Sequence, residues 1–307
     1  QMTIKHLVTH SGGFHADELL SSVILTRLFP DAKLVRSRDA TWIAPAEDRI
    51  IFDVGRAYDP DKQIFDHHQR PNPLREDNAS PYSSFGLIWK HFGRDYLRAM
   101  EVPESDVDDI HHRFDQSFVL PVDLLDNGAL EPSVAGPLSG MTLPVLLETL
   151  KPVFDDRSPD ANDRAFADAL GVARAFVEAS VRGKASKNRA ETMVTQSIKE
   201  AGDSPILELP MGMPFRSAVE KTGADHLLFV IHPRDGDWAL TTIRKSGDTF
   251  ESRADLPEAW AGLTDAALEH ACGVEGAKFC HNARFVAVAA NRDAILRMAE
   301  LAVAELS

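Results

Sequence analysis

The chain has 307 residues and a formal net charge of −14, with the hydrophobic content of an ordinary globular protein. The acidic charge argues against a protein that holds duplex nucleic acid on a broad basic face. No apolar run reaches the roughly 18 residues of a membrane span, and two cysteines are too few for a disulfide framework. We therefore expect a cytoplasmic protein without a membrane partner.

Short apolar strands and a helical segment alternate at the start of the chain. Residues 4–10 alternate between apolar and polar side chains, and residues 15–29 have apolar side chains at helical spacing. Further strands are predicted over residues 32–37, 49–55 and 62–68. This alternation is typical of parallel βαβ units, in which ligands bind beyond the carboxyl ends of the strands.

The rest of the chain is predicted to be mainly helical and then mixed. Helices are expected over residues 83–93 and 106–128, followed by a long amphipathic pattern and finally by strands mixed with helices. The predicted fold class is therefore α/β with a smaller α+β domain at the C-terminal end. We predict a first domain over 1–160, a helical connector over 161–202 and a second domain over 203–307.

Ionisable residues gather at the predicted strand ends, where such a fold places its ligand. His10 ends the first strand, Asp53 the third, and the triplet Asp66, His67 and His68 the fourth. Together with nearby residues they form a set of nitrogen and oxygen donors: His10, His15, Asp17, Asp53, Asp66, His67, His68, Asp123 and Asp126. Because no thiolate is present, the set favours manganese, iron or zinc in a hydrolytic site over structural zinc or an iron–sulfur cluster. A carboxylate shared by two ions is typical of two-metal hydrolysis of phosphate esters, and Asp53 is the best candidate.

Five motifs occur in a familiar order: "THSGGFHADE", "DVGRAYD", "FDHHQR", "SSFGLIW" and "VDLLDNG". In this order they resemble the melanocyte-proliferating-gene (MYG) family of the DHH phosphoesterase superfamily, which also includes RecJ-type nucleases and family II pyrophosphatases. The likeness extends to "LPEAWAGLTDAAL" and "FCHNARF" near the C-terminal end. The resemblance implies a parallel-sheet DHH-type domain followed by a substrate-binding domain.

The resemblance also implies two groups of metal ligands that share Asp53. One ion would be held by His10, His15 and Asp53, and the other by Asp17, Asp53, His67 and Asp123. The residues alone leave Asp123 and Asp126 as alternatives, since both lie on one face of a helix; the family motif favours Asp123.

The catalytic residues implied are Asp53, His68 and Asp66. His68 would face the substrate and protonate the leaving group, unless a water does so, while Asp66 would fix an imidazole tautomer. The candidates for substrate binding are Arg38, Arg70, Ser84, His281 and Arg284. Surface ion pairs for the arginines and helix capping for the serine are equally good explanations.

Two other features carry less information. His111 and His112 mimic the Asp-His-His triplet, and we interpret them as solvated residues of a polar helix. The superfamily has a glycine-rich loop near the C-terminal end, where this chain has Ala287, Ala289 and Ala290; each Cβ limits the approach of a phosphate.

The sequence therefore predicts a metal-dependent phosphoesterase. Two divalent ions are expected, with Mn²⁺ first and Mg²⁺, Fe²⁺ or Zn²⁺ as alternatives. The expected substrate is RNA or a short oligonucleotide degraded from an end, in the manner of an exonuclease. A pyrophosphatase, a cyclic-dinucleotide or nucleotide phosphodiesterase, and a metal-binding protein without turnover are the alternatives, and a homodimer is one option for the assembly.

Overall fold

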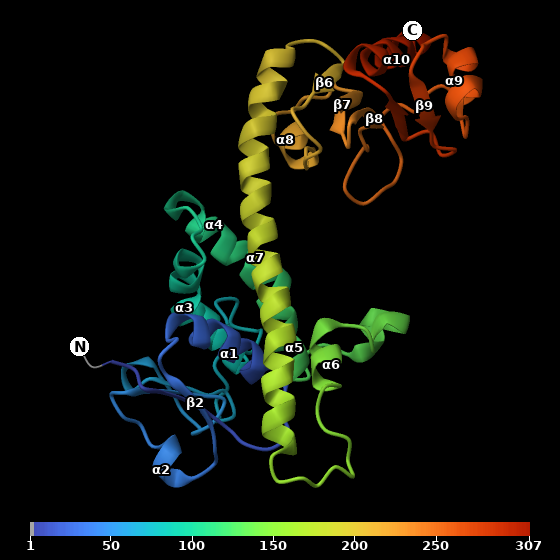
Figure 1. The fold of residues 1–307 in the computed structure, drawn as a ribbon. Coiled ribbons are helices and arrows are strands. Elements are labelled where there is room, and N and C mark those ends of the chain that lie inside the picture. Colours follow the sequence, from blue (N-terminus) through green and yellow to red (C-terminus); the bar gives the residue numbers. More distant parts are fainter. Residues whose placement is uncertain (1–2) are drawn as a thin grey trace. The chain divides into compact units, whose positions relative to one another are not determined.

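The computed structural model describes residues 3–307. The chain divides into two compact units, with the boundary between Ala185 and Ser186. The long helix α7, Ala161–Ala201, crosses this boundary and occupies the segment predicted as a helical connector (Figure 1). Each unit is described separately below.

The first unit contains a five-stranded sheet in the order β2-β1-β3-β5-β4. Its strands are β1 (His6–Thr9), β2 (Lys33–Arg36), β3 (Arg49–Phe52), β4 (Tyr58–Asp59) and β5 (Ile64–Phe65). The strands β2, β1, β3 and β5 run parallel to one another, and only the edge strand β4 is antiparallel to its neighbour β5. The four predicted strands are confirmed, and β4 is an addition that the sequence pattern did not indicate.

Helices cover this sheet and carry part of the site. They are α1 (Ala16–Leu28), α2 (Ala40–Ile43), α3 (Ser84–Ala99), α4 (Glu104–Phe114), α5 (Leu120–Asp126) and α6 (Leu143–Glu148). A π-helix, Asp115–Val119, joins α4 to α5. A 3-10 turn lies at Pro60–Lys62, and two short 3-10 helices separated by a kink at Gly136 lie at Pro132–Leu138. The helix α1 packs on α3, and its residues from Ala16 to Leu25 are all buried. Because α1 follows β1 directly, its first turn lies at the carboxyl end of the sheet.

The second unit is a smaller α+β arrangement. Its mixed sheet has the order β6-β7-β8-β10-β9, in which only β6 and β7 are parallel. The strands are β6 (Ile206–Glu208), β7 (Phe229–Arg234), β8 (Asp237–Thr242), β9 (Ala277–Cys280) and β10 (Val286–Ala289). The helices are α8 (Arg216–Lys221), α9 (Asp265–Cys272) and α10 (Arg292–Glu305), with a 3-10 turn at Glu258–Trp260. The predicted α/β fold class is thus confirmed.

The interpretation of His111 as a solvated residue is wrong. Its ring stacks on the buried Trp89, with the centroids 5.1 Å apart and the planes 8° from parallel. Each of the two rings also hydrogen-bonds to the other residue's carbonyl at 3.1 Å. The stacked pair joins α3 to α4, whereas His112 is exposed.

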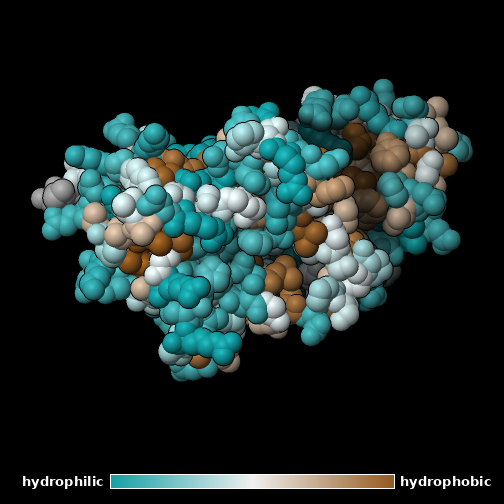
Figure 2. All heavy atoms as spheres, turned by 90° about the horizontal axis from the view of Figure 1, so that it is seen from below, coloured by the Kyte–Doolittle hydropathy of each residue, from teal (hydrophilic) through white to brown (hydrophobic). Residues whose placement is uncertain are grey.

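The surface facing the reader in Figure 2 is mostly hydrophilic, with hydrophobic residues in separate groups. No helix within residues 3–307 is both long enough and apolar enough to cross a membrane. Cys272 and Cys280 are both free thiols.

Candidate metal centre

A cavity of about 920 Å³ lies at the carboxyl ends of β1, β3 and β5. Its lining includes most of the predicted ligands: His10, His15, Asp17, Asp53, Asp66, His67, His68 and Asp126. These side chains come from four separated segments. The parallel strand order brings three of the segments to one edge of the sheet, and α5 contributes Asp126. The structure thus brings these eight predicted positions together in one cavity.

The imidazole of His67 stands among three carboxylates. Its Nε2 atom lies 3.2 Å from Asp53 Oδ1, 3.2 Å from Asp126 Oδ2 and 3.4 Å from Asp17 Oδ2. Neither this Nε2 nor either oxygen of Asp17 has a hydrogen-bond partner among the described residues, although all three atoms are buried. On the other side of the ring, Nδ1 lies 3.2 Å from Asn127 Oδ1 and so has an acceptor.

The imidazole of His10 is held in the same way. Its Nε2 atom lies 3.1 Å from Asp53 Oδ2 and 3.3 Å from Glu18 Oε1. Its Nδ1 atom lies 3.1 Å from the carbonyl oxygen of Ser11. In both histidines an oxygen acceptor faces Nδ1 and carboxylates face Nε2, and in His10 the guanidinium of Arg38 also lies 3.3 Å from Nδ1.

Asp53 stands between the two imidazoles. Its Oδ2 faces His10, while its Oδ1 faces His67 and accepts a hydrogen bond of 2.9 Å from Ser84 Oγ. The residue follows the last residue of β3 in a left-handed conformation with φ of 57°. Such a φ is uncommon outside glycine, although aspartate tolerates it better than most residues, and it is characteristic of functional positions.

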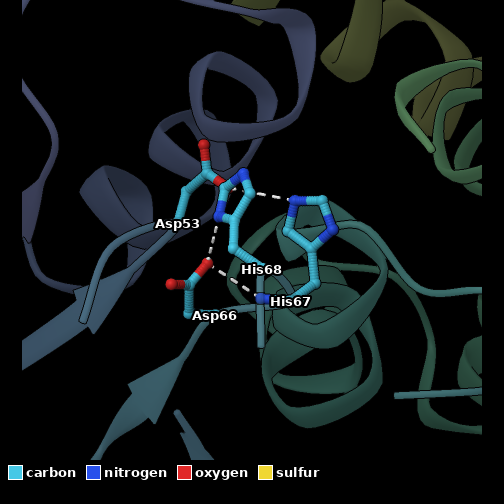
Figure 3. A group of neighbouring side chains, drawn as sticks. All are labelled: Asp53, Asp66, His67 and His68. Carbon is cyan, nitrogen blue, oxygen red and sulfur yellow. Dashed lines mark hydrogen bonds and ion pairs between the residues drawn. The ribbon is translucent and has the colours of Figure 1, made fainter. Parts of the chain in front are cut away.

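Asp66 and His68 form a supporting pair next to Asp53. One oxygen of Asp66 contacts His68 Nδ1 at 2.7 Å and accepts from the backbone N–H of His67 at 2.8 Å, as Figure 3 shows. The other oxygen accepts from the backbone N–H of Arg56 at 2.8 Å. Asp66 is buried and fully hydrogen-bonded, whereas the His68 side chain is 55% exposed to the cavity side. Asp66 was predicted to fix an imidazole tautomer, and the imidazole that its side chain contacts is that of His68.

The choice between the two aspartates of α5 is corrected by the structure. Asp123 is completely buried, and its oxygens accept hydrogen bonds from Ser83 N and Oγ, from Gly86 N and from Arg75 Nε. Asp126 instead faces His67 in the cavity. Asp123 thus has no free oxygen for a cation, and the family motif pointed to the wrong residue of the pair.

The two buried histidines have strongly shifted pKa values. Burial alone would lower the pKa of His10, but hydrogen bonding to carboxylates, Asp53 first, outweighs it and raises the pKa to about 10. Burial would also lower the pKa of His67, but the carboxylates of Asp17 and Asp53 outweigh it and raise the pKa to about 11. Burial and the charge of Asp17 raise the pKa of Asp126. Burial also raises the pKa of Glu18. These shifts indicate that, without cations, the imidazoles and carboxylates of the centre share protons.

The donor set fits a pair of divalent cations. Metal-bound histidine usually has its second nitrogen on an oxygen acceptor, which fixes the tautomer and points the other nitrogen at the ion. Both His10 and His67 meet this condition. The unpartnered buried atoms of Asp17 and His67 would be costly in a fold that had no use for them. Among the described residues, ligand atoms lie close enough to share an ion in His10, His15 and Glu18, and in Asp17, His67 and Asp126. Asp53 belongs to two further such groups, one with Asp17 and Glu18 and one with Asp66, His67 and His68.

Comparison with known proteins places the chain in a family. The family model described as MYG1_exonuc, an uncharacterised protein family (UPF0160), matches residues 6–303. The chain belongs to the MYG1 family. The MYG1 protein YER156C of Saccharomyces cerevisiae is 34% identical over 98% of this chain and 96% of its own length. The MYG1 exonuclease of Homo sapiens is 30% identical over 97% of this chain and 86% of its own length.

Among solved structures, RecJ from Thermus thermophilus in complex with Mn²⁺ is similar with a TM-score of 0.27 and 15% identity, over 98% of this chain and 52% of RecJ. An exonuclease RecJ bound to manganese gives a TM-score of 0.25 and 15% identity, over 97% of this chain and 90% of that chain. Both scores are low, and the family assignment rests on the sequence matches.

The predicted substrate-binding residues of this MYG1-family chain fall into three groups. Arg38 and Arg70 line the cavity and are exposed. Ser84 is completely buried, and its hydroxyl is used on Asp53, so the structure does not bring it to the cavity surface. His281 and Arg284 lie in the second unit, in the turn between β9 and β10, where Arg284 Nε donates to the carbonyl of Leu256.

Several cavity residues were missed by sequence reasoning. Arg56, Asn72 and Asn127 line the cavity, and Asn127 holds the ring of His67. Glu18, directly after Asp17, is completely buried beside His10. The available signal was the motif "HADE", in which the glutamate stands three residues after His15 and so shares its helix face.

Proposed function

We propose that this chain is a metal-dependent phosphodiester hydrolase that degrades RNA or short oligonucleotides from an end. One observation carries the proposal: the two oxygens of Asp53 face the Nε2 atoms of His10 and His67, within a buried set of unpartnered donors. A carboxylate placed between two ligand groups is the signature of a two-metal site. The nuclease activity is proposed because the Homo sapiens and Mus musculus relatives are named MYG1 exonuclease.

The proposed ligands are His10, His15, Asp17, Asp53, His67 and Asp126. Their nitrogen and oxygen donors suit Mn²⁺ best, with Mg²⁺, Fe²⁺ or Zn²⁺ as alternatives. Bound divalent cations would lower the pKa of a coordinated water toward neutrality and stabilise the negative charge on phosphoryl oxygens. The protein itself fixes the positions of its donors through Ser11 and Asn127, which hold the two imidazoles.

The proposed catalytic role of His68 follows from its contact with Asp66. Because Asp66 Oδ1 contacts Nδ1 at 2.7 Å, the proton of the ring is fixed on that side and the other nitrogen can exchange a proton with the substrate. The exposed half of the side chain faces the cavity, where a leaving oxygen would lie. We assign to His68 the protonation of that oxygen, and to Asp66 the orientation of the ring.

The cavity is suited to an anionic substrate of nucleotide size. Its volume of about 920 Å³ is at the upper end of ordinary ligand pockets. Arg38 and Arg70 line it, and a guanidinium can bind a phosphate through two parallel hydrogen bonds. Mn²⁺ as the native ion, a cytoplasmic location and a homodimer remain predictions of this proposal.

Hydrolysis of an end-labelled oligoribonucleotide with Mn²⁺ tests the proposal. Asp53→Asn and His67→Ala should each reduce turnover to background, while the exposed control His112→Ala should leave it unchanged. A product ladder that shortens with time from one end is expected. Full activity in either site variant contradicts the proposed centre. If the protein hydrolyses pyrophosphate or a cyclic dinucleotide but not the oligomer, the proposed substrate is wrong and the proposed metal centre stands.

A further inference from the structure

Glu18 is a buried carboxylate whose surroundings are only partly explained by the helix that carries it. It is the third residue of α1 and is 0% exposed. Its Oε1 accepts a hydrogen bond of 2.6 Å from the backbone N–H of His15 and lies 3.3 Å from His10 Nε2. Its Oε2 is buried and has no hydrogen-bond partner within residues 3–307.

Helix capping explains only one of the two oxygens. A glutamate at the third helical position that reaches back to the N-cap N–H is the second half of a capping box. Exposed capping glutamates leave their second oxygen in water, but Glu18 Oε2 is enclosed. Burying a carboxylate oxygen without a donor is energetically unfavourable, so an additional partner is expected.

The two imidazoles have matching surroundings. Around His67 Nε2 lie Asp53 and two further carboxylates. Around His10 Nε2 lie Asp53 and one further carboxylate, Glu18, within 3.3 Å. Glu18 can also place a ligand atom within 4.8 Å of atoms from both His10 and His15. Glu18 therefore occupies, on the His10 side, the place that Asp126 occupies on the His67 side.

The balance of charge leads to the same conclusion. The carboxylates around the two imidazoles belong to Asp17, Glu18 and Asp53, which are buried, and to Asp126, which is partly buried. When the imidazoles are neutral, as metal ligands must be, these four negative charges equal the charge of two divalent cations. With three carboxylates, the centre would carry one excess positive charge until a coordinated water lost its proton.

We infer that Glu18 is a ligand of the cation held by His10 and His15. The inference rests on the proposed metal centre and extends it with a residue that the family motif did not indicate. Oε2 binds the cation, and Oε1 stays on the N–H of His15. The same side chain then fixes the start of α1 and completes one side of the centre.

Crystals of the full chain grown with Mn²⁺ provide the direct test. Anomalous difference density should show two peaks, with a Glu18 oxygen at about 2.0–2.3 Å from the one on the His10 side, as is usual for carboxylates on divalent cations. Two peaks with both Glu18 oxygens beyond about 3 Å would overturn the inference and leave the metal centre intact. Absence of bound Mn²⁺ would overturn both, so the two failures are distinguishable.

Calorimetric titration with Mn²⁺ provides the second test. Glu18→Gln preserves an acceptor for the His15 N–H and removes the charge, so it separates capping from ligation. We expect the affinity for one of two Mn²⁺ ions to fall at least about tenfold, whereas the exposed control Glu275→Gln should bind as the wild type does. Unchanged affinity for both ions in Glu18→Gln would refute ligation. Should this variant fail to fold, the crystallographic distance in the wild type still decides.

Discussion

The two aspartates of α5 should respond in opposite ways to the same isosteric substitution. Asp123→Asn is expected to destabilise the fold without removing a metal ligand. In the variant, the amide oxygen can keep the hydrogen bonds from Ser83 and Gly86. The amide N–H₂ then replaces the oxygen that now forms a 2.8 Å ion pair with Arg75 Nε, so two N–H donors face each other. Breaking a buried ion pair from one side costs roughly 3–5 kcal/mol.

The expected loss lies near the lower end of this range. Arg75 keeps a second carboxylate partner, because its two terminal nitrogens contact Asp115 at 2.7 and 2.9 Å. The guanidinium is therefore not left unpaired, and we expect a loss of about 3 kcal/mol in the free energy of unfolding. The folded variant should bind Mn²⁺ with an affinity within about threefold of the wild type, because Asp123 does not line the cavity. A threefold change in affinity corresponds to less than about 1 kcal/mol of binding free energy.

Asp126→Asn should weaken Mn²⁺ binding without destabilising the fold. The carboxylate lies among Asp17 and Asp53 and burial raises its pKa, so removing its charge should leave the metal-free fold as stable or slightly more stable. Loss of a ligand should weaken Mn²⁺ binding by at least about tenfold. Urea unfolding followed by circular dichroism and calorimetric titration of both variants measure the two effects. A stable Asp123→Asn variant that has lost Mn²⁺ affinity would refute the assignment.

Two further predictions follow from the same geometry. Because the pKa values of His10 and His67 are about 10 and 11, both rings are protonated at pH 7, and cations must displace these protons. Mn²⁺ affinity should therefore rise with pH, and calorimetry in buffers of different ionisation enthalpy should report proton release; equal enthalpies in all buffers would contradict this. Gly86→Ala should destabilise the fold by about 1–3 kcal/mol, because a Cβ there would overlap the carboxylate of Asp123. The matched change Gly171→Ala in α7, where a Cβ meets nothing within 4 Å, should gain up to about 1 kcal/mol in the same urea experiment.

The strand ends of the first unit could be predicted because their cause is local. Short apolar runs form buried parallel strands, and the residues that follow such runs must lie at the carboxyl edge of the sheet. For this reason His10, Asp53 and His67 could be assigned to one site without any knowledge of their distances. The structure places all three around the same cavity.

The choice between Asp123 and Asp126 could not be made in this way. The two residues are three positions apart on one helix and share a face, so periodicity treats them alike. Arg75 decides between them, and it comes from a loop 48 residues away in the sequence. No local pattern indicates that this guanidinium reaches α5.

Glu18 was missed for a related reason. A glutamate in the first turn of a helix is expected to cap it and to face solvent. Here the first ten residues of α1 are buried on all sides, so the sequence has no apolar stripe and polar face from which the buried side of the helix could be predicted. The burial of Glu18 depends on how α1 packs against the rest of the first unit, which only the tertiary structure determines.

The buried carboxylates of the first unit can be sorted by what their oxygens contact. Asp123 has four hydrogen bonds from protein donors, and both oxygens of Asp66 also have partners. Both oxygens of Asp17 and one of Glu18 have none within residues 3–307. A buried carboxylate with a full set of donors, such as Asp123, is already compensated and serves the fold, whereas one without donors needs a proton, a water or a cation. The bonding of the oxygens therefore marks Asp123 as structural and Asp17 and Glu18 as candidate metal ligands. Asp53, whose oxygens contact His10 Nε2 and Ser84 Oγ, is a candidate because it lies between the two imidazoles.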